Sequence, residues 1–161
     1  MAVYKLLIDD FVTIEYGLIA IHSTLEDHRL AYFMNRELDI QLEKGPNDIG
    51  VKIKEGESSF SRFVFEDEDN DNTWNLIQNK NNVTSAQSNT TASLFDDGAT
   101  VTTNVYLMPE LKKVDYVLKI ETEPLSFDFD AVISKLLGIR QVTTAYKIDH
   151  QKLKSKNNLI F

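Results

Sequence analysis

Apolar residues spaced three and four positions apart predict two amphipathic helices. The first covers 25–38, and its shared face carries Leu30, Phe33, Met34 and Leu38. Thr24 offers a hydroxyl N-cap, and Asp27 stands three residues later, where its carboxylate can reach back to the cap. The pattern ends before Gly45-Pro46, a pair that marks a turn.

The second helix follows Pro124. Ser126 or Asp128 supplies its N-cap, and Gly138 stands where a glycine ends a helix. Its apolar face carries Phe129, Val132, Ile133, Leu136 and Leu137.

Alternating or β-branched runs predict strands along the rest of the chain. They lie at 3–8 and 13–22 (one or two strands), 50–54, 60–65, 73–79, 100–107, 116–121 and 142–149. The acidic run 66–72 joins two of them as a hairpin turn.

Two further segments of the middle region have the composition of connections between strands. The stretch 81–93 is rich in Asn, Ser and Thr and poor in large apolar residues, which predicts a mobile surface loop. Asp97-Gly98 is a two-residue hairpin signal between Leu94-Phe95 and the run over 100–107.

The C-terminal third predicts the fold class. Strand 116–121, the second helix and strand 142–149 have the spacing of a βαβ unit. We therefore expect one α+β domain over 1–161, with a mostly antiparallel sheet of six to eight strands. Both amphipathic helices should lie on one face, with a ferredoxin-like βαβ element at the C-terminus. An all-antiparallel sheet with the helices split across its ends is the alternative.

Composition narrows the function classes. The net charge of −8 argues against nucleic acid, because a surface that follows phosphates needs clustered Lys and Arg. The chain has no cysteine, which excludes disulfides and thiolate chemistry. No apolar run approaches the roughly 20 residues of a membrane-spanning helix, and the run at 3–8 is too short for a signal peptide. These features predict a cytoplasmic protein.

Metal sites find little support in the sequence. Asp67, Asp69 and Asp71 alternate like the start of a calcium-binding loop, but the positions for its Gly and Glu hold Asn72 and Gln78. The histidines have no metal-ligand spacing; they are His22, His28 and His150. We expect a solvated turn at the acids, with no metal or other cofactor.

The segment 108–116 concentrates the unusual residues. On a structural reading, Pro109 ends a strand, Glu110 suits the start of a short turn, and Asp115 accepts backbone N–H groups. Tyr116 then covers the edge of the core. On a functional reading, Glu110 and Asp115 are a carboxylate pair and Tyr116 an acid or a ligand contact.

This segment resembles the signature of the IPExxxVDY family of Bacteroidota proteins. The matching residues are Pro109, Glu110, Val114, Asp115 and Tyr116, with Met108 in place of the leading isoleucine. Further similar stretches are Leu30-Ala31-Tyr32, Trp74-Asn75-Leu76-Ile77 and the chain end over 152–161. The resemblance implies no activity, cofactor or substrate, so we assign no catalytic, cofactor-binding or metal residue.

Three functions follow as hypotheses. The first is a non-catalytic interaction or scaffold module, with a homodimer through an edge strand as one form of it. The second is a small-molecule-binding regulatory module of ferredoxin-like type. The third is an enzyme that uses Glu110, Asp115 and a tyrosine, which requires these side chains to converge in a cleft.

Overall fold

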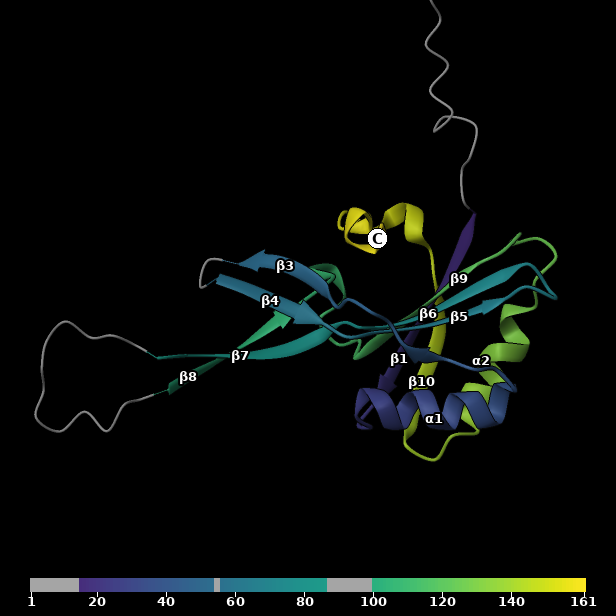
Figure 1. The fold of residues 1–161 in the computed structure, drawn as a ribbon, viewed down its shortest axis with the longest axis horizontal. Helices are drawn as coiled ribbons and strands as arrows, with labels where there is room; N and C mark the ends of the chain where they lie inside the picture. Colours follow the sequence, from purple (N-terminus) through teal and green to yellow (C-terminus); the bar gives the residue numbers. More distant parts are fainter. Residues whose placement is uncertain (1–14, 54–55, 87–99) are drawn as a thin grey trace, which may run out of the picture.

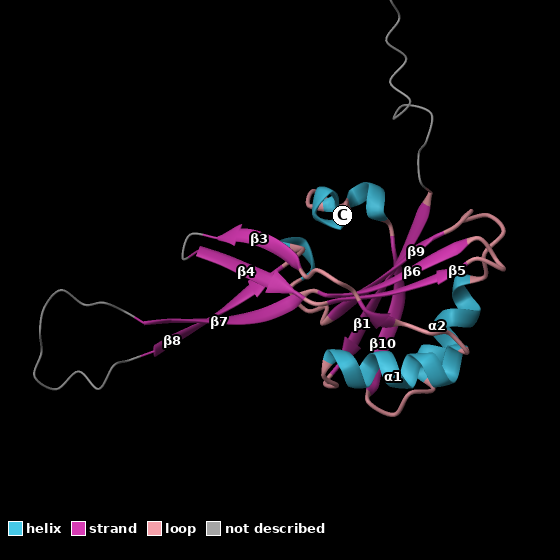
Figure 2. Ribbon diagram, viewed as in Figure 1, coloured by secondary structure: helices cyan, strands magenta, loops and turns pink. Residues whose placement is uncertain are grey.

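A six-stranded antiparallel sheet forms the centre of the molecule (Figures 1 and 2). The computed structural model describes residues 15–53, 56–86 and 100–161. The predicted strand at 3–8 and the Asp97-Gly98 turn lie outside these residues. The strands of the sheet, in spatial order, are β10 (Val142–Ile148), β1 (Tyr16–Ser23), β9 (Tyr116–Glu121), β6 (Asn72–Gln78), β5 (Arg62–Asp67) and β2 (Glu43–Lys44).

The predicted βαβ element is confirmed, and it is one half of a larger pattern. Strands β9 and β10 both run antiparallel to β1, so they are parallel to each other with β1 between them. Helix α2 (Phe129–Leu137) joins them. Likewise β1 and β6 are parallel and flank β9. The order β10-β1-β9-β6 is therefore that of interleaved, ferredoxin-like βαβ units.

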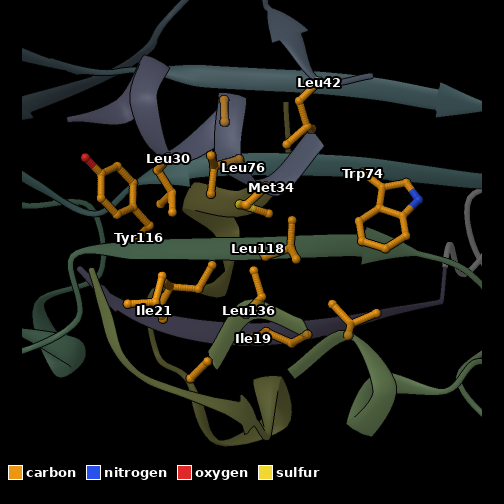
Figure 3. Packing of buried hydrophobic residues seen from close by; sticks show 14 of the residues in the cluster. Ile19, Ile21, Leu30, Met34, Leu42, Trp74, Leu76, Tyr116, Leu118 and Leu136 are labelled. Atoms are coloured by element: carbon orange, nitrogen blue, oxygen red, sulfur yellow. The ribbon is translucent and has the colours of Figure 1, made fainter. Parts of the chain in front are cut away.

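Both helices cover the same face of the sheet, as predicted. Helix α1 (Asp27–Leu38) contributes Leu30 and Met34 to the core, and α2 contributes Leu136. They pack on alternate residues of the central strands (Figure 3), including Ile19, Ile21, Leu76, Leu118 and Ile120. Each large apolar side chain buried in this way stabilises the fold by about 1.5–3 kcal/mol.

Contacts at the helix ends differ in part from the prediction. Asp128 caps α2 as expected, its Oδ1 accepting from the Ala131 N–H at 3.0 Å. Thr24 does not cap α1, which begins at Asp27 after Glu26 without a side-chain cap. The hydroxyl of Ser23 instead accepts from the Leu25 N–H at 3.2 Å, because the chain turns before the helix begins.

The opposite face is covered by turns and by the C-terminal segment. That segment contains two 3-10 turns, η3 (His150–Lys152) and η4 (Lys156–Leu159). Leu153 and Leu159 are buried in a second apolar cluster beneath them. Leu159 is therefore docked on the core, whereas Ile160 and Phe161 are exposed.

Two hairpins project from one end of the sheet (Figure 1). One pairs β3 (Ile49–Ile53) with β4 (Gly56–Phe60), and the other pairs β7 (Lys80–Ala86) with β8 (Thr100–Tyr106). The loop predicted over 81–93 is thus wrong for 81–86, which pair as a strand, and 87–93 lie outside the described residues. The strand predicted at 60–65 breaks at Ser61, where the chain passes from β4 to β5. The β5–β6 hairpin is confirmed.

Candidate functional site

The segment 108–116 runs from the end of β8 to the start of β9 as two successive tight turns. Pro109 opens the 3-10 turn η2 (Pro109–Leu111), where a residue without an N–H is tolerated. The Leu111 N–H donates to the Met108 carbonyl at 2.9 Å, and the Val114 N–H to the Leu111 carbonyl at 3.0 Å. Met108 and Val114 are buried, so they anchor the segment at both ends.

Asn79, which is fully buried, holds this segment in place. Its Nδ2 donates to the carbonyls of Leu111 and Val114, each at 2.9 Å. Its Oδ1 accepts from the Met108 N–H at 2.9 Å. Its backbone N–H donates to the Asp115 carbonyl at 2.9 Å. One amide side chain therefore pairs three backbone groups of the turn, a role that the sequence did not reveal.

Asp115 and Tyr116 connect the segment to the start of α1. The Asp115 carboxylate accepts from the Ser23 N–H at 2.9 Å. The Tyr116 hydroxyl donates to the Leu25 carbonyl at 2.6 Å, and the side chain is 7% exposed. Burial, together with the charges of Asp27 and Asp115, raises the pKa of Tyr116 well above its ordinary value of 10.0.

Glu110 binds the C-terminal segment. Its carboxylate accepts from the Ser155 N–H at 2.7 Å and from the Ser155 hydroxyl. Burial alone would raise the pKa of Glu110, but the hydrogen bonds from Ser155, together with the backbone N–H groups of Glu110 and Lys154, outweigh it and hold the pKa below 4.5. Ser155 was not predicted as a partner, because it is 45 residues away in the sequence.

The two carboxylates do not share a cleft. Asp115 and Tyr116 line a small polar cleft of about 180 Å³ beside Lys80. Glu110 is not among the residues that line it. Because each carboxylate already accepts hydrogen bonds from a different partner, the arrangement offers no paired acid and base.

The other candidate ligands are also dispersed. His22 contacts the Tyr146 hydroxyl at 3.2 Å, and His150 stacks on Tyr16 with ring centres 4.3 Å apart. In the acidic turn, the Asp67 carboxylate accepts from the backbone and side-chain N–H groups of Asn70. Across the described ranges, no three His, Cys, Asp or Glu side chains are placed to hold a metal ion.

The two edges of the central sheet differ sharply. One edge is β2, with only two residues, both charged, followed by Gly45-Pro46. The other is β10, with seven residues. Within the described part of the chain, β10 pairs with β1 on one side and with no strand on the other. The β10 edge is therefore the candidate interaction site.

None of the helices in the described ranges is long and apolar enough to cross a membrane. Comparison with known proteins finds no matching family model, curated protein or solved structure.

Proposed function

We propose that this chain is a non-catalytic interaction module that pairs with a second copy of itself through the outer edge of β10. The observation that carries the proposal is the open backbone of this strand. A strand edge with unpaired N–H and C=O groups is a template for a further strand. A two-fold axis lets the same edge serve both partners.

The direction of the β10 backbone groups follows from the pairing of β1. The Asp115 N–H donates to the Ile21 carbonyl at 3.1 Å, so the backbone groups of Ile21 face β9. Because directions alternate along a strand, those of Ala20 face β10, where Ala20 lies opposite Tyr146. The backbone groups of Tyr146 therefore face β1, and the N–H and C=O groups of Ala145 and Lys147 face away from it. Thr143 lies where the register of the pairing shifts, so alternation does not give its direction.

Side chains do not guard this edge. Proteins often place a lysine on an open edge strand, where its charge prevents pairing with another chain. Here the Lys147 ammonium lies over the Phe129 ring of α2, 4.5 Å from its centre. Phe129 itself packs against the backbone of Gly17, where an added Cβ would meet the ring. Tyr146 leans on His22, with ring centres 5.6 Å apart. Both large side chains are thus held above and below the sheet, which leaves the backbone accessible.

The strand is also compatible with itself in an antiparallel pair. With the two-fold axis at Ala145, each Ala145 lies opposite its counterpart, and each Lys147 faces the uncharged beginning of the other strand. No like charges then face each other, because Lys147 is the only charged residue in β10. One strand pair is a small interface, so we expect a dissociation constant of roughly 1–100 µM.

Light scattering coupled to size-exclusion chromatography tests the proposal over a dilution series. We expect the mass to rise from 18.4 kDa towards twice that value with concentration. Ala145→Pro removes one outward N–H without breaking the β1 pairing and should remain at 18.4 kDa. Ala145→Gly keeps the N–H and is the matched control, which should still dimerise.

Two results would overturn the proposal: a wild-type mass that stays monomeric at every concentration, or an Ala145→Pro variant that dimerises like the wild type. Circular dichroism checks that the variant is folded. If Ala145→Pro does not fold, Lys147→Pro removes a second outward N–H at the end of the same strand.

Membership of the IPExxxVDY family is likewise a proposal. Its support is the motif itself, in which Glu110, Asp115 and Tyr116 each hold a distant part of the chain. A family signature of this kind marks a shared fold rather than a shared reaction.

A further inference from the structure

A cleft of about 580 Å³ lies on the helix side of the molecule, away from the motif. Three parts of the chain line it: the end of α1, the β5–β6 turn and the segment that leads into α2. Its volume is in the range of sites that hold small molecules. It is independent of the β10 edge, since none of its lining residues belongs to β10.

An unpaired donor lies beside this cleft. Trp74 is among the lining residues and is 6% exposed, and its Nε1 has no hydrogen-bond partner in the described part of the chain. Figure 3 shows the indole nitrogen directed away from the other labelled core residues. Phe127 packs edge-on against the indole, with ring centres 5.7 Å apart. Buried indole N–H groups usually have a partner, so this one calls for an acceptor.

The charged groups of the cleft limit the chemistry of a ligand. Asp39, Asp67 and Asp128 contribute carboxylates, and Lys135 contributes an ammonium group. Three carboxylates against one ammonium group disfavour an anion. A simple cation offers no acceptor to the Lys135 ammonium group or to the Trp74 N–H. The carboxylates are also too dispersed for a metal, since the described residues contain no cluster able to hold one.

Hydroxyl groups satisfy all of these requirements. A hydroxyl donates to a carboxylate and accepts from an indole N–H or an ammonium group. We propose that the cleft binds a neutral polyhydroxylated ligand, a monosaccharide unit, with its oxygen facing Trp74. The Asp39 carboxylate and the Lys135 ammonium group bind hydroxyls at the rim, and Phe127 contacts the apolar face of the ring. Because the Nε1 atom itself is buried, lining side chains shift when the ligand reaches it.

The chain has one tryptophan, so one indole N–H resonance reports on the site. The full-length protein labelled with ¹⁵N is titrated separately with glucose, galactose, xylose and mannose. We expect a saturable shift of the indole resonance with at least one sugar. Inorganic phosphate and spermidine, at equal concentrations and ionic strength, should leave it in place.

A matched pair of variants locates the binding. Asp39→Asn removes a carboxylate from the cleft, and Asn tolerates the left-handed backbone of this residue, with φ of 54°. Asp130→Asn makes the same change on α2 outside the residues that line the cleft. We expect sugar affinity to fall about five- to tenfold in Asp39→Asn and to stay unchanged in Asp130→Asn.

The proposal is overturned if no sugar moves the resonance or if phosphate or spermidine moves it instead. It is also overturned if the two variants bind alike. The oligomeric state does not enter these readouts, so the outcome is separate from that of the β10 pairing.

Discussion

Asn79 should matter most for stability among the polar side chains around the segment 108–116. Its replacement by alanine should lower the free energy of unfolding more than replacement of any of the others. The substitution removes the amide that pairs with Met108, Leu111 and Val114. The Leu111 carbonyl keeps a second donor, the Val114 N–H at 3.0 Å. The Met108 N–H and the Val114 carbonyl lose the amide, and both residues are buried.

The magnitude follows from these two groups. A buried backbone group left without a partner costs about 1–3 kcal/mol, so two of them cost about 2–6 kcal/mol. We expect a loss near 4 kcal/mol in the free energy of unfolding. For a chain of this length, this lowers the melting temperature by about 8–16 °C.

Asn75 provides the matched control, since it also has no exposed surface. Its Oδ1 accepts from Arg62 Nε at 3.0 Å, but its Nδ2 has no partner among the described residues. Asn75→Ala therefore loses one hydrogen bond and should cost about 1–1.5 kcal/mol. Urea unfolding of both variants measures the difference. If Asn79→Ala costs no more than Asn75→Ala, Asn79 does not organise the segment.

Two further predictions concern the residues that the segment contributes. Tyr116→Phe removes the hydrogen bond to the Leu25 carbonyl and should cost about 1 kcal/mol at neutral pH. Because the pKa of Tyr116 is raised in the fold, its contribution is present below about pH 10 and is lost as the pH rises through the folded value. Urea unfolding should show a smaller alkaline loss of stability in Tyr116→Phe than in the wild type, and equal losses would contradict this. The contribution of Glu110 is present above its ordinary pKa of 4.5 and is lost as the pH falls through the lowered folded value. Glu110→Gln should speed amide hydrogen exchange of the C-terminal segment at neutral pH. Glu68→Gln, a change in the β5–β6 turn, is the control. If exchange in Glu110→Gln is as slow as in the control, Glu110 does not hold the C-terminal segment.

Local patterns predicted the parts of the fold that depend on local burial. Helix α2 was predicted from its apolar face and from Asp128, and both hold because each acts within a few residues. The same applies to β9 and β10 and to the βαβ unit that they form. The position of β1 between β9 and β10 had no local signal, since strand pairing is decided by contacts across the whole chain.

The errors have identifiable physical causes. The segment 81–86 has few large apolar residues, but its backbone is paired by β8, and that pairing does not need an apolar pattern. The helix cap predicted at Thr24 was wrong because α1 begins two residues later than predicted, at Asp27, so Glu26 occupies the N-cap position. Asn79 stands in a polar stretch, and only the fold shows that its amide faces three buried backbone groups.

Amide hydrogen exchange at the outer edge of β10 tests the central claim most directly. The N–H groups of Ala145 and Lys147 point away from β1 and have a partner only in the proposed dimer. We predict that their exchange slows as the protein concentration rises, while that of Tyr146, which faces β1, is slow throughout. Fast exchange of both amides at every concentration would contradict the claim that this edge pairs with a second copy.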